Sequence, residues 1–189
     1  MVTATSNEKV IYYNQLKNKE VDWLWYPYIP YGKITVIQGD PGEGKTSVAL
    51  YLAAILSVGG SLPFSEQKIE PQNVIYQNRE DGLADTVKPR LDLYGADCKK
   101  VCYLNENEQH ISLTNDMLEK VVVETNTRLL ILDPIQSFFG SGDMLRAVDV
   151  RNIMGNLCKV AERTNCAVLL IGHLNKNESG KDLYRGLAQ

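Results

Sequence analysis

Short apolar runs alternate along this chain with longer segments of helical composition. The apolar runs are predicted to be buried strands, at residues 33–38, 73–77, 100–104, 128–132 and 167–171. Helices are predicted between them, at residues 47–56, 83–94, 114–125 and 148–163. Strands that alternate with helices in this way predict an α/β fold with a mostly parallel central sheet.

The segment ahead of the first strand has a different pattern. Residues 21–30 are aromatic and interrupted by two prolines, so we expect an extended lead-in that packs on the core. A chain of 189 residues is long enough for one domain with a substantial core. We therefore assign residues 1–20 to an N-terminal lead-in and residues 21–189 to the domain.

The first strand is followed by the motif Gly-x-x-x-x-Gly-Lys-Thr, at residues 39–46. A strand before it and a helix after it are the context of a phosphate-binding loop, in which backbone N–H groups surround phosphate oxygens at a helix N-terminus. Lys45 is expected to reach the β- and γ-phosphates, and Thr46 to offer its hydroxyl to Mg²⁺. The expected nucleotide-binding residues are Gly39, Asp40, Pro41, Gly42, Glu43, Gly44, Lys45, Thr46 and Ser47. The alternative is an ordinary glycine-rich turn between a strand and a helix.

Two more strands end in carboxylates, and the carboxyl ends of parallel strands meet at one edge of a sheet. Asp133 follows an apolar strand and is expected to hold Mg²⁺, directly or through a water molecule. Glu80 and Asp81 follow a strand that we expect to lie beside the phosphate-loop strand. We favour Glu80 as the carboxylate that orients or deprotonates a hydrolytic water. The alternative is that both acids favour the first turn of the next helix.

The last predicted strand is followed by His173, which we expect to contact the γ-phosphate and to report its loss. The alternative is a histidine that only makes structural hydrogen bonds. Two loops leave the same predicted edge, at residues 137–149 and 174–185, and both are rich in Gly and Ser and partly basic. They are candidates for loops that sense nucleotide or touch a polymer, and the alternative is that they are simply solvated.

Composition and charge bear on the partners and the cellular location of the protein more than on the reaction it catalyses. The net charge of −3 does not indicate nucleic-acid binding, but a ring-shaped enzyme can confine its basic residues to a few loops. No stretch approaches the ~18 apolar residues of a membrane span. The four cysteines lack the spacing of a zinc site, and with no signal-like segment this predicts a reducing, cytoplasmic location.

Taken together, these segments resemble the RecA-like branch of P-loop ATPases, and within it the hexameric replicative helicases of the RepA type and their bacterial and phage relatives. The matching segments are 23–25, 29–33, 80–82, 90–91, 132–136, 172–176 and 184–186. The resemblance implies a three-layer RecA-like core that uses ATP and Mg²⁺, with its active site between subunits of a homo-oligomeric ring.

The same resemblance implies roles for single residues. Glu80 would polarise the attacking water, Lys45 and His173 would contact phosphate, and a neighbouring subunit would contribute an arginine. Arg185 lies in the matching Arg-Gly motif, although the family places a better candidate shortly downstream. Because the family continues with further strands, we expect the C-terminal strands to be missing from this chain.

Two functions follow as hypotheses. The first is a Mg²⁺-dependent ATPase that acts on DNA, with single-stranded DNA as a possible partner, as a helicase or a motor of replication or mobile elements. The second is a nucleotide-dependent switch or assembly scaffold without helicase activity. The sequence pI of about 5.5 slightly favours the second.

Overall fold

The computed structural model describes residues 10–66, 68–105, 113, 116–139 and 147–173, and the account below concerns these residues. Their centre is a five-stranded sheet in the order β3-β9-β8-β6-β7, in which every neighbouring pair is parallel. The strands are β3 (Ile34–Gly39), β6 (Asn73–Asn78), β7 (Val101–Cys102), β8 (Thr127–Asp133) and β9 (Ala167–His173). The predicted α/β class with a parallel sheet is therefore confirmed.

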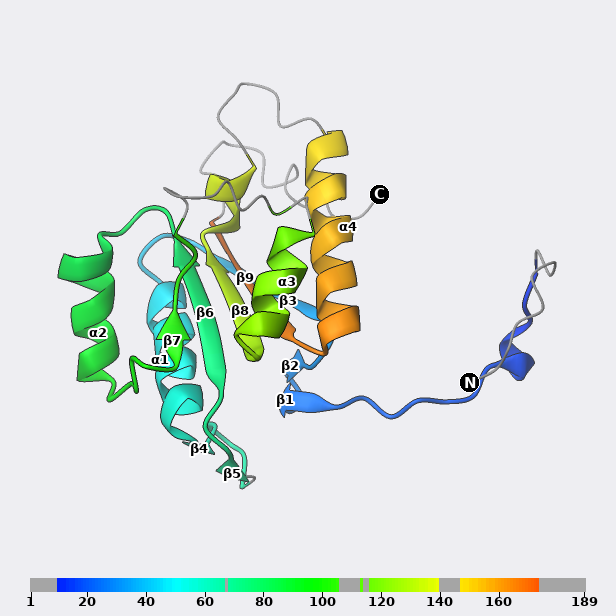
Figure 1. Cartoon of the computed structure of the whole chain (residues 1–189), viewed down its shortest axis with the longest axis horizontal. Coiled ribbons are helices and arrows are strands. Elements are labelled where there is room, and N and C mark those ends of the chain that lie inside the picture. The colour runs from blue at the N-terminus through cyan, green and yellow to red at the C-terminus, as the bar shows by residue number, and fades with distance from the viewer. Residues whose placement is uncertain (1–9, 67, 106–112, 114–115, 140–146, 174–189) are drawn as a thin grey trace.

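Helices cover both faces of this sheet and give three layers (Figure 1). One face is covered by α1 (Lys45–Val58), by the π-helical turn η2 (Leu83–Val87) and by α2 (Lys88–Leu93). The other face is covered by α3 (Met117–Glu124) and α4 (Ala147–Thr164).

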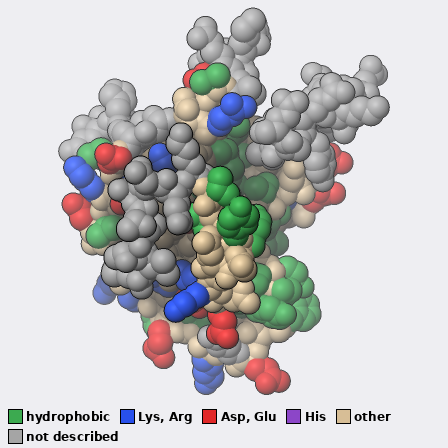
Figure 2. All heavy atoms as spheres, turned by 90° about the vertical axis from the view of Figure 1, so that its right-hand side faces the viewer, with side chains coloured by type: hydrophobic (Ala, Val, Ile, Leu, Met, Phe, Trp, Pro, Cys, Tyr) green, Lys and Arg blue, Asp and Glu red, His purple; other side chains and the backbone are tan. Residues whose placement is uncertain are grey.

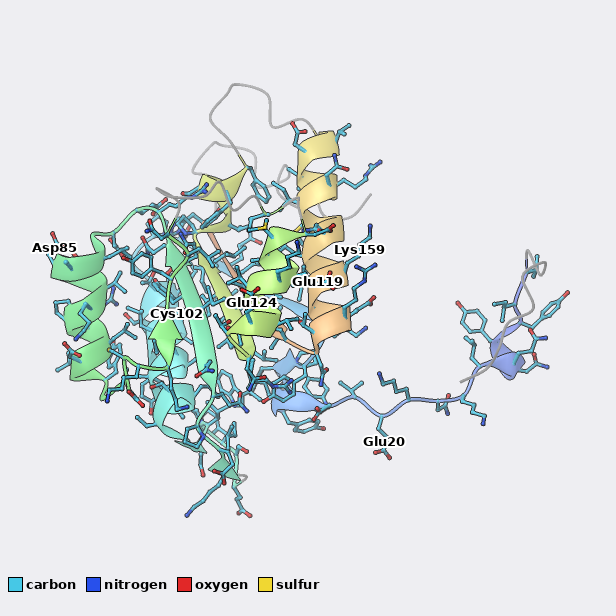
Figure 3. The ribbon with its side chains drawn as sticks, in the orientation of Figure 1. Glu20, Asp85, Cys102, Glu119, Glu124 and Lys159 are labelled. Carbon is cyan, nitrogen blue, oxygen red and sulfur yellow. The ribbon has the colours of Figure 1, made fainter. Side chains whose placement is uncertain are left out.

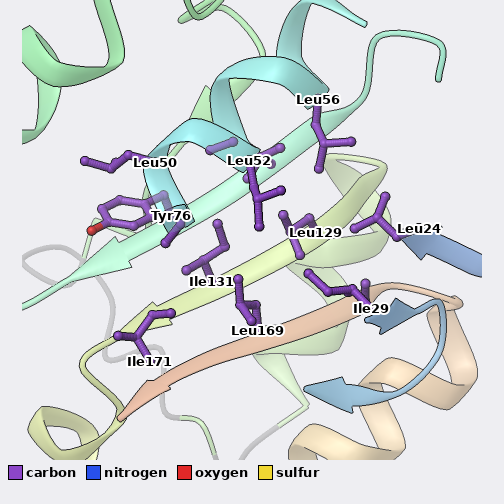
Figure 4. Close-up of a cluster of buried hydrophobic side chains, with 14 of the residues drawn as sticks. Leu24, Ile29, Leu50, Leu52, Leu56, Tyr76, Leu129, Ile131, Leu169 and Ile171 are labelled. Atoms are coloured by element: carbon purple, nitrogen blue, oxygen red, sulfur yellow. The ribbon is translucent and has the colours of Figure 1, made fainter. Parts of the chain in front are cut away.

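Side chains of the central strand alternate between the two layers. In β8, Leu129 and Ile131 pack under α1, whereas Leu130 and Leu132 pack under α3 and α4. Because the side-chain period of a strand is two, Asp133 belongs to the α1 face. Figure 4 shows the α1-side cluster, with Tyr76 of β6 among the aliphatic side chains.

The helices differ in how they meet the sheet. Helix α1 buries most of its length, and Ala49, Ala53 and Ala54 allow its backbone to approach the strands closely. Helix α4 buries a single stripe, Ile153, Leu157, Val160 and Ala161, at the spacing of one helical face. Charged side chains lie on the outer surfaces, as Figure 3 shows for Asp85, Glu124 and Lys159.

One expectation about the order of the strands was wrong. The strand that leads to Glu80, β6, does not lie beside the phosphate-loop strand β3, because β8 and β9 lie between them. Hydrophobic pattern fixes which segments become strands, but the order within a sheet depends on how the crossovers pack.

Element lengths also differ from the predictions. The strand expected at 100–104 is ordered as a strand only over Val101–Cys102, and the helix expected from residue 114 begins at Met117, residue 114 itself being outside the described part.

Two short hairpins were not predicted. The expected extended lead-in at 21–30 forms an antiparallel pair, β1 (Trp23–Trp25) with β2 (Ile29–Pro30), which does pack on the core through Leu24 and Ile29. A second pair, β4 (Gly60–Ser61) with β5 (Lys68–Ile69), follows α1.

The described residues before the first hairpin, 10–22, are all exposed. They include the short 3-10 helix η1 (Tyr13–Gln15) and lead away from the sheet in Figure 1. In the described part of the chain, no helix has both the length and the apolar character needed to cross a membrane.

Candidate active site

The carboxyl ends of four strands meet at one edge of the sheet, as the parallel arrangement predicts. In the strand register Gly39 of β3 lies opposite His173 of β9, and Asn78 of β6 lies opposite Asp133 of β8. Strands β8 and β9 are themselves neighbours, with Leu132 opposite Leu170. The phosphate-loop motif, Glu80, Asp133 and His173 are thereby brought to a single edge.

The phosphate-loop motif begins where β3 ends and finishes inside the first turn of α1. Gly42 and Gly44 have φ values of +87° and +82°, a backbone conformation that glycine adopts at no steric cost. The buried Lys45 ammonium donates hydrogen bonds to the carbonyl oxygens of Gly39, at 2.8 Å, and Asp40, at 2.6 Å. The Lys45 side chain therefore folds back onto the start of the phosphate-binding loop.

The loop is also closed by one of its own carboxylates. The backbone N–H of Asp40 donates to Oε2 of Glu43 at 2.8 Å. This carboxylate lies so close to Gly39 that a Cβ added there would stand 2.1 Å from Oε2. A side chain at position 39 would therefore displace the Glu43 carboxylate from the Asp40 N–H.

The end of the motif is linked to the neighbouring helix. Arg90 of α2 donates from Nη2 to Oγ of Ser47 at 2.7 Å. Ser47, which the sequence placed among the nucleotide-binding residues, is therefore already in contact with a cation. The contact ties α2 to the first turn of α1.

Asp133 is buried and receives a hydrogen bond from the neighbouring strand. The Tyr76 hydroxyl donates to Oδ2 of Asp133 at 2.7 Å, and Asn78 Nδ2 donates to the same hydroxyl at 3.3 Å. Burial, with the Asp133 carboxylate beside it, raises the pKa of Tyr76 far above its ordinary value. The hydroxyl therefore remains protonated, as a donor to the carboxylate, throughout the neutral range.

Asn78 also shapes the chain that carries Glu80. Its Oδ1 accepts hydrogen bonds from the backbone N–H groups of Glu80, at 2.8 Å, and Asp81, at 2.7 Å. This side-chain cap turns the backbone sharply after β6. Tyr76 and Asn78 were not among the predicted site residues, and the signal for them was the run of polar side chains, Tyr-Gln-Asn, in the last half of a buried strand.

Glu80 and His173 are brought together across the edge. His173 Nε2 lies 3.5 Å from Oε2 of Glu80, and the Ser137 hydroxyl donates to Oε1 of Glu80 at 3.4 Å. The other ring nitrogen, Nδ1 of His173, is buried and has no hydrogen-bond partner among the described residues. Glu80 itself is exposed, so water reaches its carboxylate.

The segment after Asp133 forms the short 3-10 helix η3 (Ile135–Phe138). The Gln136 side chain donates from Nε2 to the His173 carbonyl at 2.9 Å and accepts from the His173 N–H at 3.4 Å. Arg79 donates to the Ser137 carbonyl at 2.9 Å, and its guanidinium lies 4.2 Å above the Phe138 ring. Gln136 and Arg79 were not predicted to be site residues, and Ser137 was included only as the first residue of the loop predicted at 137–149.

The site suits a hard cation only in combination with other ligands. No group of three or more His, Cys, Asp or Glu side chains able to hold a metal ion occurs among the described residues. A buried carboxylate, Asp133, and a hydroxyl at the start of α1, Thr46, are the oxygen ligands that Mg²⁺ accepts when phosphates and water complete its shell. The residues present therefore fit Mg²⁺ bound together with a nucleotide.

Some predicted residues lie outside the described part. Arg185 and the loop predicted at 174–185 are not described, and of the loop predicted at 137–149 only residues 137–139 and 147–149 are. The structure therefore brings together Lys45, Glu80, Asp133 and His173, and leaves Arg185 a prediction.

Comparison with known families gives a match along most of the chain. A family described as an AAA domain matches residues 7–179, which include every site residue discussed above except Arg185.

Several curated relatives are DNA repair proteins named RadA. The protein from Bacillus subtilis is 28% identical over 154 residues, which make up 78% of this chain and 29% of the relative. The protein from Helicobacter pylori is 25% identical over 183 residues, 94% of this chain and 36% of the relative. The protein from Streptococcus pneumoniae is 26% identical over 149 residues, 77% of this chain and 31% of the relative. The chain thus spans about a third of the length of these relatives.

Proposed function

The chain belongs to the AAA-domain family of P-loop ATPases, and from that premise we propose that it hydrolyses ATP with Mg²⁺ and couples hydrolysis to work on DNA. The observation that carries the proposal is the contact between Glu80 and His173 at the edge where the phosphate loop begins. A carboxylate for water and a polar group for phosphate are the two parts that a bare phosphate-binding loop lacks.

In this proposal each residue acts from the position described above. Lys45 turns from the carbonyls of Gly39 and Asp40 to the phosphates and neutralises charge that develops during transfer. Glu80, held by His173 and Ser137, orients the attacking water and accepts its proton.

Thr46 and Asp133 would hold Mg²⁺, which would neutralise charge on the phosphate oxygens when bound. Tyr76 keeps the Asp133 carboxylate in a fixed orientation by its hydrogen bond to Oδ2. His173 contacts the γ-phosphate and transmits its loss to Glu80 through their 3.5 Å contact. In this proposal nucleotide binding depends on the phosphate loop after β3 and on Asp133 of β8, whereas turnover depends on Glu80 after β6 and His173 of β9.

The coupling to DNA is supported by the relatives, which are named DNA repair proteins. We propose a helicase or a related motor of replication or of mobile elements, assembled as a homo-oligomeric ring. In such a ring an arginine of a neighbouring subunit, with Arg185 as one candidate, completes the site. Single-stranded DNA is the expected polymer.

A nucleotide-dependent switch or scaffold is the second candidate. It is favoured by the charge of the chain, which is −3 overall, and by the face in Figure 2, where basic and acidic side chains are interspersed. A DNA motor usually presents a continuous basic surface to the phosphate backbone. In a switch, ATP binding would drive assembly, and slow hydrolysis would act as a timer.

Steady-state hydrolysis with and without single-stranded DNA separates these functions. We expect Mg²⁺-dependent release of phosphate that rises when single-stranded DNA is added at low salt. ATP-dependent assembly with no response to several DNAs would instead support the switch. Absence of nucleotide binding in a folded protein would refute both.

Two carboxylate variants test the assignment of Glu80. Glu80→Gln should retain ATP binding and lose at least about 100-fold in turnover, because it removes the base while keeping the side-chain size. Asp81→Asn is the matched control, since Asp81 adjoins Glu80 and shares its backbone cap on Asn78. Equal losses in the two variants would contradict the choice of Glu80.

A further inference from the structure

The ladder between β8 and β9 ends before it reaches His173. Its last pair is Leu132 with Leu170, after which the chain leaves the sheet at Asp133 and enters η3. On its other side His173 still pairs with β3, opposite Gly39. The backbone of His173 therefore needs a second partner to stay in strand geometry.

The Gln136 carboxamide supplies that partner. It donates to the His173 carbonyl at 2.9 Å and accepts from the His173 N–H at 3.4 Å, as a residue of an adjacent strand does. The neighbouring Gly172 has no side chain, and a Cβ there would stand 3.7 Å from Gln136 Nε2. The amide thus contacts the end of β9 through both of its polar atoms, next to the Cα that carries the His173 ring.

The next two residues of η3 hold the other strand end. Ser137 donates to the Glu80 carboxylate at 3.4 Å and accepts from Arg79 at 2.9 Å. The Phe138 ring lies under the Arg79 guanidinium at 4.2 Å, and Phe138 is itself buried in the core. Three consecutive residues of η3, 136–138, thereby contact the ends of β6 and β9, the two strands that are followed by or end in Glu80 and His173.

We propose that η3 is a positioning element of the active site, in which Gln136 orients His173 and Ser137 orients Glu80. The proposal rests on the proposed function, because it concerns how the two groups of that site are held. Neither residue needs to touch nucleotide. Loss of either contact lets the Glu80–His173 pair drift apart, which weakens turnover and the discrimination between ATP and ADP while binding to the phosphate loop persists.

The test compares two glutamines in the full chain. Gln136→Met removes both hydrogen bonds at nearly constant volume. Gln72→Met is the matched control, because Gln72 is also partly buried and makes two hydrogen bonds, to the Tyr31 hydroxyl, away from the site. For each variant the kcat and KM for ATP, the Kd values of ADP and of a non-hydrolysable ATP analogue, and the melting temperature are measured.

We expect Gln136→Met to lower kcat by about 10- to 100-fold, the cost of a small misplacement of catalytic groups. The Kd of ADP should stay within about twofold of wild type, and the preference for the ATP analogue should fall to that of His173→Ala. Adding Gln136→Met to His173→Ala should change this preference by less than about twofold, because the two residues act as one unit. Gln72→Met should keep wild-type kcat and preference.

Three outcomes would overturn the inference. If Gln136→Met and Gln72→Met behave alike in kcat and nucleotide preference, η3 is no more than a structural turn, and the proposed function stands. If wild type binds neither nucleotide, the proposed function fails and the inference fails with it. Independent, multiplying losses in the Gln136→Met/His173→Ala double variant would also contradict the proposal.

Discussion

Replacement of Tyr76 by Phe tests the hydrogen bond on which the Asp133 carboxylate depends. Tyr76 and Asp133 are 2% and 1% exposed, so water cannot easily take the place of the lost hydroxyl. The ring itself remains, and with it the packing of Tyr76 in the α1-side cluster. The substitution therefore removes one donor to a buried carboxylate and little else.

The magnitude follows from the type of bond. A hydrogen bond to a charged group contributes about 1.5–3 kcal/mol, and the second bond to this hydroxyl, from Asn78 at 3.3 Å, is long and adds little. We expect Tyr76→Phe to lower the free energy of unfolding by about 1.5–3 kcal/mol. For a chain of this size, that corresponds to a fall in Tm of roughly 3–12 °C.

The loss should be nearly the same at every pH in the neutral range. Burial raises the pKa of Tyr76, so the hydroxyl is a donor in the folded state throughout the neutral range. Mg²⁺-dependent binding of ATP should weaken as well, because Asp133 loses the partner that orients it.

Equilibrium unfolding in urea, followed by the fluorescence of Trp23 and Trp25, measures the effect. Tyr31→Phe is the control, because the Tyr31 hydroxyl bonds a neutral partner, Gln72, and should contribute only about 0.5–1.5 kcal/mol. A double-mutant cycle of Tyr76→Phe with Asp133→Asn should give a coupling of at least about 1 kcal/mol. A loss no larger than that of Tyr31→Phe, with no coupling, would refute the argument.

Three further predictions concern the phosphate loop, a strained turn and a buried thiol. Lys45→Ala should abolish ATP-dependent activity, by at least about 100-fold, with the fold retained by circular dichroism, and unchanged hydrolysis would refute the assignment. Gly59→Ala should destabilise the protein by about 1–3 kcal/mol, because Gly59 has a φ of +77° and a Cβ would stand 2.9 Å from the Ile69 carbonyl. The control is Gly155→Ala, at an exposed position of α4 with open space around it, which should be neutral or stabilising in the same thermal melts. Burial raises the pKa of Cys166 from 9.0 to about 12, so its contribution is fully present below about pH 9 and is lost as the pH rises towards 12, because only the unfolded chain ionises there. As the pH is raised from 8 to 10.5, the free energy of unfolding of wild type should therefore fall by up to about 2 kcal/mol more than that of Cys166→Ala. Cys158→Ala, at an exposed position, should follow wild type. Parallel curves of unfolding free energy against pH for all three proteins would contradict this.

The strands and the edge of the site were predictable because both depend on local pattern. The run at 128–132 has no polar alternation and became the central strand β8, covered on both faces. The motif at 39–46 is contiguous in sequence, so its loop and the start of α1 could be placed closely. The rule for parallel sheets then put Asp133 and His173 at the same edge.

The contacts within the site were not predictable in the same way. Tyr76 and Asp133 are 57 residues apart in sequence, and their hydrogen bond exists because β6 and β8 are neighbours, which no local pattern determines. For the same reason β6 was wrongly expected beside β3. Gln136 resembles any polar residue of a loop until the end of β9 is placed beside it.

The geometry after Asp133 has a consequence for variation among related sequences. Within residues 133–137, one side chain bonds Tyr76, one pairs with the backbone of His173, one holds Glu80, and Pro134 and Ile135 are buried. A scan of all substitutions should find this pentapeptide as intolerant of change as the interior of a strand, although it forms no strand beyond Asp133. The exposed segment 10–22 should tolerate most replacements, so a map of tolerance would locate the site without any assay of its chemistry.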